Sequence, residues 1–388
     1  MMLHDAPRLP RGFYCASRNC GLKPTGNDLS VFFSEAPASA AAVFTRNHFP
    51  GAPVILGRET IRSGRLQAIV INSKISNVGT GAAGIENARR MAQAVAAEFS
   101  IAADTVLVSS TGVIAKQLAI EKIETGIVGI RALLSDDPMV GATGIMTTDT
   151  YPKALSMSVG QATVTLVAKG SGMIEPNMAT MLAYIFTDAA LPAADLDAML
   201  RRAVGVSFNM LSVDTDTSTS DTCAIMANGL AGAVAADAFE AALTFCCVEM
   251  AKKLARDGEG ATKLLEIRVS GAASPQEARI VAKSIVNSPL IKTMAYGADP
   301  NIGRVLMAVG KCQDCQVHPP SITVVINGAL VFKNLQRQDY DDAHLRQLLS
   351  GEHVVIDVDL GVGPGAATTY GCDLTEGYIR ENAAYYSS

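Results

Sequence analysis

The stretch with the clearest chemical potential is residues 169–182, which read K-G-S-G-M-I-E-P-N-M-A-T-M-L. Two glycines and a proline separate two apolar runs, 162–168 and 181–186, and both runs are typical of buried strands. Thr180 places a hydroxyl at the start of the second run. Such a hydroxyl is a weak nucleophile that needs an adjacent base. The pattern alone also fits a tight connection followed by a Thr-led strand.

This stretch resembles the processing motif of the ornithine acetyltransferase (glutamate N-acetyltransferase) family. In that family the chain cuts itself between the Ala and the Thr, so the resemblance implies Ala179 and Thr180 as the cleavage point. Thr180 then becomes the first residue of a second chain and the acyl-accepting nucleophile. The cut supplies what the hydroxyl lacks, because a free α-amine on the same residue titrates near neutrality and can act as its base. Glycines at 170 and 172 permit the backbone geometry of the attack.

A second motif, S-T-G-V-I, follows the strand expected over residues 105–110. The resemblance makes the Thr111 hydroxyl and the Gly112 backbone N–H an oxyanion hole. A tetrahedral intermediate needs fixed donors where negative charge develops, and glycine lets the backbone approach closely. The alternative is a strand-to-helix turn in which a hydroxyl caps the helix expected over residues 120–134.

Further motifs that resemble the family are I-M-T-T-D-T at 145–150, D-G-E-G-A-T-K at 257–263 and the C-terminal stretch. The substrate contacts that the resemblance implies are Thr147, Lys169, Thr180, Glu259, Asn382 and Ser387. The Glu259 carboxylate would suit a cationic amine such as that of ornithine. Without the resemblance, Thr147 would be part of a polar turn and Glu259 a solvated charge.

The chain departs from the family at two places. Ile302 stands where the family usually has Trp, and Ala384 stands where an acid is usual. These departures leave room for a related acyltransferase with a specialised donor or acceptor.

Patterns typical of metal or phosphate sites are incomplete, so no metal is expected. Cys312 and Cys315 form a C-x-x-C without a second pair, and Cys246 and Cys247 fit a helix core, so reduced structural thiols are expected. Residues 214–222 lack the glycine and the final acid of a calcium loop and are interpreted as a hydrogen-bonded turn lining the site. The Gly-rich residues 79–84 lack the Lys-Ser/Thr ending of a phosphate loop.

The composition indicates a globular chain with two or three domain cores. Of its 388 residues, 49% are hydrophobic and 18% are charged. The formal net charge of -5 argues against nucleic acid or an anionic membrane as the main partner. The first residues lack an apolar signal core, and no apolar run is long enough for a bilayer span, so the cytoplasm is the expected compartment.

The pattern of elements indicates α/β or α+β architecture. Strands are expected at 31–33, 41–44, 66–71, 105–110, 162–168, 181–186, 263–269, 322–326, 330–332 and 354–360. Helices are expected at 86–99, 120–134, 191–204, 238–256, 275–287 and 341–349, and a short one opens near 298–304. The resemblance implies a layered α/β/α sandwich built from two self-cleaved chains, 1–179 and 180–388. It implies that these form a heterodimer, usually doubled to a heterotetramer.

The activity that the resemblance implies is transfer of an acetyl group from N-acetylornithine to glutamate in arginine synthesis. We expect a ping-pong reaction through an acetyl ester on Thr180, in which Lys169, Thr147 and Asn382 hold the amino-acid head that both substrates share. No cofactor is expected, with acetyl-CoA as a candidate second donor. The alternative from another class is an N-terminal-nucleophile hydrolase or aminopeptidase, in which water takes the acyl group.

Overall fold

The computed structural model describes residues 2–175 and 181–383. The chain forms two compact units, each made of discontinuous segments. The first comprises Met1–Gly170, Pro176–Asn209 and Thr217–Met250, and the second comprises Ser171–Glu175, Met210–Asp216 and Ala251–Ser388. The division predicted at 179/180 does not coincide with a boundary between the two compact units; it lies outside the described residues and stays a prediction.

The described residues of the first unit form a nine-stranded mixed sheet in the order β1-β6-β7-β8-β10-β3-β4-β5, with β2 beside β3. The bounds are β1 Met2–Leu3, β2 Phe13–Arg18, β3 Leu29–Phe44, β4 Arg65–Asn72, β5 Val106–Ser110, β6 Lys153–Val159, β7 Ala162–Lys169, β8 Leu182–Ala189 and β10 Thr222–Gly232. Strands β4 and β5 are parallel, as are β8 and β10, whereas β7 and β8 are antiparallel.

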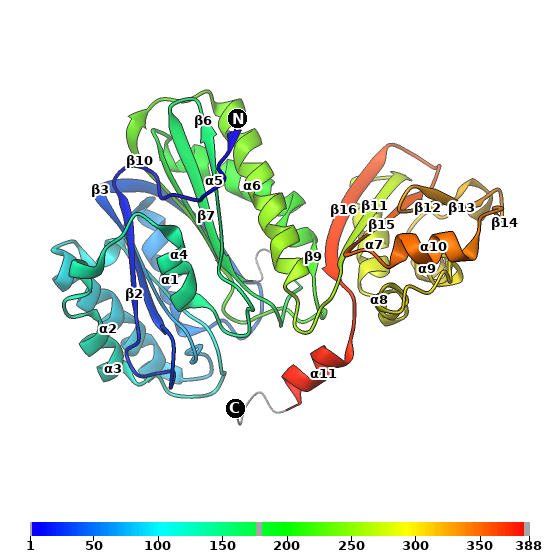
Figure 1. The fold of residues 1–388 in the computed structure, drawn as a ribbon. Coiled ribbons are helices and arrows are strands. Elements are labelled where there is room, and N and C mark those ends of the chain that lie inside the picture. Colours follow the sequence, from blue (N-terminus) through cyan, green and yellow to red (C-terminus); the bar gives the residue numbers. More distant parts are fainter. Residues whose placement is uncertain (1, 176–180, 384–388) are drawn as a thin grey trace. The chain divides into compact units, whose positions relative to one another are not determined.

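Helices cover both faces of this sheet. They are α1 Ala52–Thr60, α2 Gly81–Phe99, α3 Ile120–Ile127, α4 Pro138–Ile145, α5 Ala193–Val206 and α6 Ala236–Arg256. Along β4, Ala68 and Val70 share one core with α2 and α3, which lie side by side (Figure 1). Ile69 and Ile71 face the opposite way and share a core with α4. Because successive strand residues point to opposite faces, this alternation makes the first unit a layered α/β/α sandwich.

The second unit is built on a seven-stranded sheet in the order β14-β13-β12-β15-β11-β16-β9. The strands are β9 Leu211–Ser212, β11 Leu264–Ala272, β12 Thr323–Ile326, β13 Ala329–Lys333, β14 Gln336–Arg337, β15 His353–Asp359 and β16 Gly365–Cys372. The helices are α7 Pro275–Val286, α8 Pro289–Tyr296, α9 Gly303–Gly310, α10 Asp342–Leu349 and α11 Glu376–Asn382. Ile267 of β11 and Ile356 of β15 pack in one core with Ile285 of α7. Glu266 and Arg268, which alternate with these core residues along β11, form an ion pair with N···O 2.7 Å.

Most expected elements are confirmed, and the errors have local causes. The strands expected at 31–33 and 41–44 are one continuous strand, β3. The helix expected over 120–134 ends at Ile127, because the chain turns at Gly129 with φ +75°, and a single turn of 3-10 helix follows. Strand β6 stands between the I-M-T-T-D-T motif and the strand expected at 162. Strand β10, which the sequence analysis did not predict, is rich in Ala and Gly and lacks the β-branched pattern that marks a strand.

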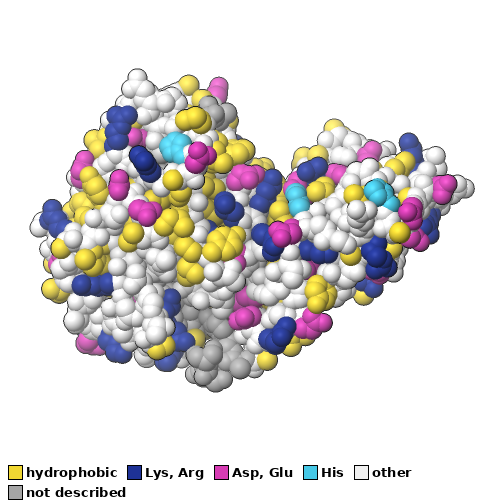
Figure 2. All heavy atoms as spheres, viewed as in Figure 1, with side chains coloured by type: hydrophobic (Ala, Val, Ile, Leu, Met, Phe, Trp, Pro, Cys, Tyr) yellow, Lys and Arg dark blue, Asp and Glu magenta, His cyan; other side chains and the backbone are white. Residues whose placement is uncertain are grey.

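Charges of both signs are mixed on one face of the molecule. Figure 2 shows basic and acidic side chains interspersed on the visible face. None of the described helices combines the length and apolar character that a bilayer span requires.

A pair of Gly→Ala substitutions tests the packing of the first unit. At Gly141 in α4, an added Cβ would collide with the buried ring of Phe32, so Gly141→Ala should destabilise the protein by about 1–3 kcal/mol. At Gly205 in α5, a Cβ would meet no described atom within 4 Å, so Gly205→Ala should stabilise it by about 0.5–1 kcal/mol. Thermal unfolding measures both changes. Equal shifts of the two melting temperatures would contradict this account of the α4–β3 contact.

Candidate functional site

The processing motif lies between two buried strands, as the sequence predicted, and these strands pair in antiparallel fashion. Lys169 is the last residue of β7 and pairs with Leu182, the first residue of β8. Ala179 and Thr180 lie outside the described residues, so their roles stay predictions. The described ends of the loop are held by contacts that sequence reasoning did not foresee.

The predicted oxyanion residues follow β5 in a strained turn. Gly112 has φ +125°, and a Cβ there would overlap the backbone of Lys74, which itself has φ +82°. Only glycine fits this close approach without strain. Thr111 is nearly buried, and Lys169 Nζ donates a long hydrogen bond to its Oγ1 at 3.4 Å. The structure therefore brings Thr111 and Lys169 together. The alternative of a helix cap is wrong, because α3 begins after Ala119 and has no side-chain cap.

One carboxylate, Asp149, organises this part of the first unit. Its Oδ1 accepts from Gly170 N at 2.7 Å and from Lys153 Nζ at 2.8 Å, and its Oδ2 accepts from Thr147 N at 3.0 Å. The side chains of Asp149 and Lys153 are fully buried. Burial alone would raise the pKa of Asp149, but the charges of Lys169 and Lys153 outweigh burial and hold that pKa below its usual value. Asp149 thus fixes the backbone at Thr147 and at the start of the processing loop.

Sequence reasoning missed Asp149, although it lies in the I-M-T-T-D-T motif. The available signal was the spacing to Lys153, an acid and a base four residues apart beside an apolar run. The spacing alone does not reveal a buried pair, because most such charges are solvated.

Another lysine, Lys23, lies near Thr147. Its Nζ donates to Met146 O at 2.8 Å, the carbonyl just before Thr147. The buried carboxylate of Asp28 accepts from the backbone N–H of Lys23 at 2.8 Å and holds this residue in place. Burial is the main cause that lowers the pKa of Lys23; the charge of Asp28, and less so that of Asp149, opposes this, and the charges of Lys169 and Lys74 add to it. Lysines 23, 74, 153 and 169 outnumber the neighbouring carboxylates of Asp28 and Asp149, and this excess of positive charge suits a carboxylate ligand.

In the second unit, two predicted substrate residues lie together. Asn382 Nδ2 of α11 donates to Glu259 Oε2 at 2.7 Å. Helix α11 docks on the turn that bears Glu259, because Gly260, at φ +67°, lies against the backbone of Gly377 where a Cβ would collide. Thr375 Oγ1 strengthens this contact by donating to Gly260 O at 2.6 Å. The C-terminal stretch is therefore docked as far as Asn382.

The same turn contacts the processing loop. Glu259 N donates to Ser171 O at 2.9 Å, and Gly172 lies so close to the Glu259 carboxyl that a Cβ would overlap it. Nearby, burial and the charges of Asp214 and Glu259 raise the pKa of Tyr378 to about 12. This group of residues is acidic, in contrast to the lysines of the first unit. Ser387 lies outside the described residues.

The run at 214–222 contains the hydrogen-bonded turn that the sequence predicted. Asp214 Oδ1 accepts from Asp216 N at 3.3 Å within the turn. Burial raises the pKa of Asp214, and the backbone N–H groups of Ile174, Met173 and Asp216 partly offset that rise. Its proposed position at the lining of the site stays a prediction.

The remaining patterns are structural. All eight cysteines are free thiols. Cys246 and Cys247 are fully buried in α6, and burial raises the pKa of Cys246 to about 12, which keeps its thiol protonated and unreactive. Across the described ranges, no group of three or more His, Cys, Asp or Glu side chains is placed to hold a metal ion. Ile302, at the first departure from the family, packs against the core of the second unit, whereas Ala384 lies outside the described residues.

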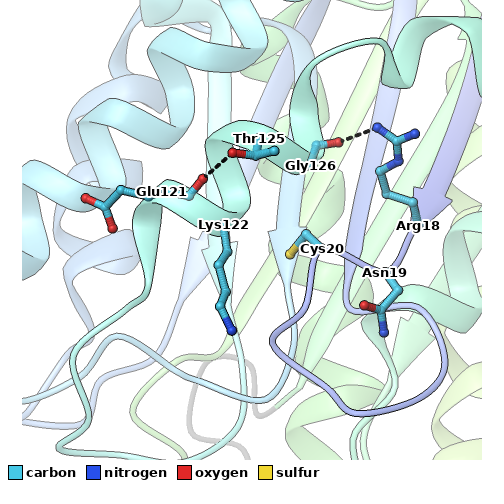
Figure 3. A pocket seen from close by; sticks show the side chains of 7 residues that line it. All are labelled: Arg18, Asn19, Cys20, Glu121, Lys122, Thr125 and Gly126. Atoms are coloured by element: carbon cyan, nitrogen blue, oxygen red, sulfur yellow. Dashed lines mark hydrogen bonds between the residues drawn. The ribbon is translucent and has the colours of Figure 1, made fainter.

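A surface pocket in the first unit has a volume of about 500 Å³ (Figure 3). Its lining residues are Arg18, Asn19, Cys20, Glu121, Lys122, Thr125 and Gly126. Arg18 donates to Gly126 O at 3.0 Å and Thr125 donates to Glu121 O at 2.8 Å, so two of its polar side chains are engaged in holding α3. None of its lining residues is a predicted site residue.

Comparison with known proteins decides the family. The ArgJ family matches residues 14–387. This chain belongs to the ArgJ family. Over 97% of its length it is 47% identical to "Arginine biosynthesis bifunctional protein ArgJ 2" of Clostridium acetobutylicum, of which 98% is covered. Over 99% of its length it is 44% identical to the whole of "Glutamate N-acetyltransferase Oat2" of Streptomyces clavuligerus.

A solved member of the ArgJ family confirms the fold. The crystal structure of "Arginine biosynthesis bifunctional protein argJ" from Bacillus halodurans matches 53% of this chain and 100% of its own chain, at 40% identity and a TM-score of 0.51. The predicted family and the layered α/β fold are therefore confirmed. The roles of the individual site residues stay predictions. They are supported by two contacts among the described residues, Lys169 with Thr111 and Asn382 with Glu259.

The buried pair of Asp149 and Lys153 can be tested by a double-mutant cycle. Asp149→Asn leaves a buried ammonium without its carboxylate and should destabilise the protein by about 3–5 kcal/mol, measured by urea unfolding. Lys153→Met in the same chain should recover part of that loss, because both charges are then gone. Because the folded pKa of Asp149 is lowered, its stabilisation is present above the usual carboxyl pKa and is lost as pH falls through the folded value.

An exposed pair provides the control for this cycle. Asp197 and Arg201 in α5 form an ion pair with N···O 2.8 Å in which both side chains are more than 40% exposed. Asp197→Asn should change the free energy of unfolding by only about 0–1 kcal/mol. A loss at Asp149 no larger than at Asp197 would refute the organising role of Asp149.

Proposed function

We propose that this chain is a glutamate N-acetyltransferase that takes its acetyl group from N-acetylornithine in arginine synthesis. The observation that carries the proposal is its membership of the ArgJ family over nearly its whole length, with a relative of that name matched end to end. The contact between Thr111 and Lys169 and the contact between Glu259 and Asn382 support it, because residues assigned to one function lie together within each unit.

The active enzyme would form by self-cleavage. The Thr180 hydroxyl oxygen bonds to the Ala179 carbonyl carbon, the Ala179–Thr180 C–N bond breaks, and the hydroxyl proton passes to the nitrogen that leaves as the Thr180 α-amine. Water then hydrolyses the resulting ester to the Ala179 carboxylate and the Thr180 hydroxyl. The Bacillus halodurans relative supports a cut near the middle of the chain, because about half of this chain matches the whole of that one. The proposed piece 180–388 is likewise slightly more than half.

Acetyl transfer would follow in two steps through Thr180. The hydroxyl oxygen bonds to the acetyl carbon of N-acetylornithine, and the Thr180 α-amine carries the hydroxyl proton to the leaving amine of ornithine. The amine of glutamate then attacks the acetyl ester, and the Thr180 oxygen regains a proton. Thr111 Oγ1 and Gly112 N–H would donate to the oxyanion in both steps.

Substrate recognition would use the two charged groups of residues. In the first unit, Thr147 and Lys169, with Lys23 and Lys74 nearby, offer donors and positive charge to a carboxylate. In the second unit, the Glu259 carboxylate offers negative charge to the ornithine amine, and Asn382 and Ser387 would add polar contacts. Both substrates share an α-carbon that carries a carboxylate and a nitrogen, whereas only N-acetylornithine and its product ornithine carry a side-chain cation.

The assembly and its cosubstrates follow from the same proposal. The two cleaved chains, 1–179 and 180–388, would stay together as a heterodimer, doubled to a heterotetramer in the cytoplasm. No cofactor is required for the transfer, because the acyl group passes directly to the Thr180 hydroxyl. Acetyl-CoA as a second donor would fit the word "bifunctional" in the names of several relatives.

Intact mass spectrometry tests this mechanism. The wild-type protein should give two chains whose masses sum to the precursor plus one water, and Thr180→Ala should stay whole. N-acetylornithine alone should add one acetyl mass to the chain that begins at Thr180, and glutamate should remove it.

Steady-state kinetics test the covalent intermediate in a second way. Double-reciprocal rate plots should be parallel. Intersecting plots without a trapped acetyl chain would favour direct transfer, and acetate release without an acceptor amine would favour a hydrolase.

Removing the side-chain donor of the oxyanion hole should affect chemistry more than binding. Thr111→Ala should lower kcat about a hundredfold to a thousandfold with little change in KM. Thr125→Ala is the matched control, because the Thr125 hydroxyl only donates to Glu121 O within α3. If Thr111→Ala raises KM alone, Thr111 binds the ground state of the substrate instead.

A further inference from the structure

The processing loop contains a short segment, Ser171–Glu175, that belongs to the second unit although Gly170 before it belongs to the first. The segment ends four residues before Ala179, the residue on the N-terminal side of the proposed cut. The contacts that fix its backbone therefore fix the chain just before the proposed cleavage site. Glu259, which holds Ser171 at the start of the segment, has a proposed role in acetyl transfer, whereas the groups that hold residues 173–175 have none in the mechanism above.

A single carboxylate binds the middle of the segment. Asp214 Oδ2 accepts from Met173 N at 2.6 Å, and Asp214 Oδ1 accepts from Ile174 N at 2.7 Å. Hydrogen bonds to an ionised acceptor are short and strong, and two from consecutive residues fix the orientation of the peptide unit between them. Met173 lies in the left-handed region at φ +53°, a conformation that the two bonds to Asp214 help to hold.

Backbone bonds extend the contact on both sides of Asp214. Val213 N donates to Ile174 O at 2.7 Å, and Glu175 N donates to Asp216 O at 2.9 Å. The turn at 213–216 and the segment at 173–175 thus pair over several consecutive residues. We call these four hydrogen bonds, two to the Asp214 carboxylate and two between backbones, the clamp. All of them lie within the second unit.

A second anchor lies at the end of the segment. Glu175 Oε2 accepts from Asn287 Nδ2 at 2.8 Å, and Glu175 Oε1 lies 3.5 Å from Lys283 Nζ. Lys283 Nζ also donates to Leu211 O at 2.7 Å, and burial lowers the pKa of Lys283 to about 8. Glu175 is therefore tied to helix α7 and to Asn287, which follows it.

We propose that Asp214 is a positioning residue for self-cleavage, holding the backbone at Met173 and Ile174 so that the Ala179 carbonyl can meet the Thr180 hydroxyl. This inference rests on the self-cleavage proposed above. Intramolecular attack is fast only when the reacting groups are held in a near-attack geometry. Releasing the clamp returns backbone freedom to the residues upstream of the cut, and the loss of order at even one residue should slow the cut about tenfold or more.

The variants are chosen to separate charge from shape. Asp214→Asn keeps the size of the side chain but removes the charge and one of its two acceptor oxygens. Asp214→Glu keeps the carboxylate and should restore part of the rate. Asp216→Asn is the matched control, because the exposed Asp216 contributes its backbone carbonyl to the clamp, which the substitution leaves in place.

The measurement is the rate at which full-length precursor is converted to two chains after a pulse of synthesis, followed by intact mass. Asp214→Asn should accumulate precursor and cut at least about tenfold more slowly than wild type, whereas Asp216→Asn should cut at the wild-type rate. Cleavage of Asp214→Asn at the wild-type rate overturns the proposal. Equal slowing in Asp216→Asn overturns it too, since the effect would then not belong to the clamp.

Folding is controlled in a background that is not expected to cut. Thr180→Ala with and without Asp214→Asn should melt within a few degrees of each other. A large drop in the melting temperature would assign the slow cleavage to misfolding and reject Asp214 as a positioning residue. A wild-type chain that stays whole would refute the self-cleavage itself, and with it this inference. Normal cutting of Asp214→Asn beside a cut wild type refutes the clamp alone.

Discussion

The buried carboxylate of Asp149 is the interaction on which the described part of the site in the first unit depends. Its two oxygens accept from two donors within four residues, Thr147 N and Lys153 Nζ, and from Gly170 N, which lies 21 residues further along the chain. Lys153 begins β6 and pairs with Ala168 near the end of β7, so the ion pair lies at the open end of that hairpin. A buried pair stabilises a fold only when its remaining hydrogen-bonding capacity is satisfied, and the backbone N–H groups meet that condition here. The position of Lys169 beside Thr111 follows from this arrangement.

Close backbone contacts at glycines set the rest of the geometry. Gly112 lies against Lys74, and Gly172 lies against the Glu259 carboxyl, in places where any side chain would overlap. Both glycines belong to motifs that carried the resemblance in the sequence, S-T-G-V-I and K-G-S-G-M. Their importance is steric, because each lets a polar group approach a main chain more closely than a Cβ allows. Each contact involves one charged residue of the candidate site. Lys74 is one of the lysines in the first unit, and Glu259 is one of the acids in the second.

The fold also explains how a chain cut at 179/180 would stay assembled. Strands β8 and β10, which follow the proposed cut, lie between β7 and β3, which precede it. Their antiparallel ladders would join the two pieces through continuous backbone hydrogen bonds in the sheet of the first unit. Ser171–Glu175 makes a second connection, because this end of the first piece pairs with a turn from the second piece inside the second unit. Hydrogen bonding and burial could therefore replace the lost peptide bond.

The sequence alone determined the motifs, the family and the elements with strong periodicity. Strands β4, β5, β7 and β8 were predictable because a short run of apolar residues is typical of a strand that is buried on both faces. The assignment of Thr111, Lys169, Glu259 and Asn382 to the site came only through the resemblance, and their contacts with one another were not predicted.

Only the tertiary structure decided what holds these residues in place. Three hydrogen bonds that do this join residues far apart in the sequence. Lys23 and Met146 are separated by 123 positions, Asp214 and Met173 by 41, and Asp149 and Gly170 by 21. A sequence pattern reports the local preference of each residue and does not state which distant backbone N–H or carbonyl a buried charge will find. That choice is made when the chain packs, because a buried polar group must find a partner wherever the fold places one.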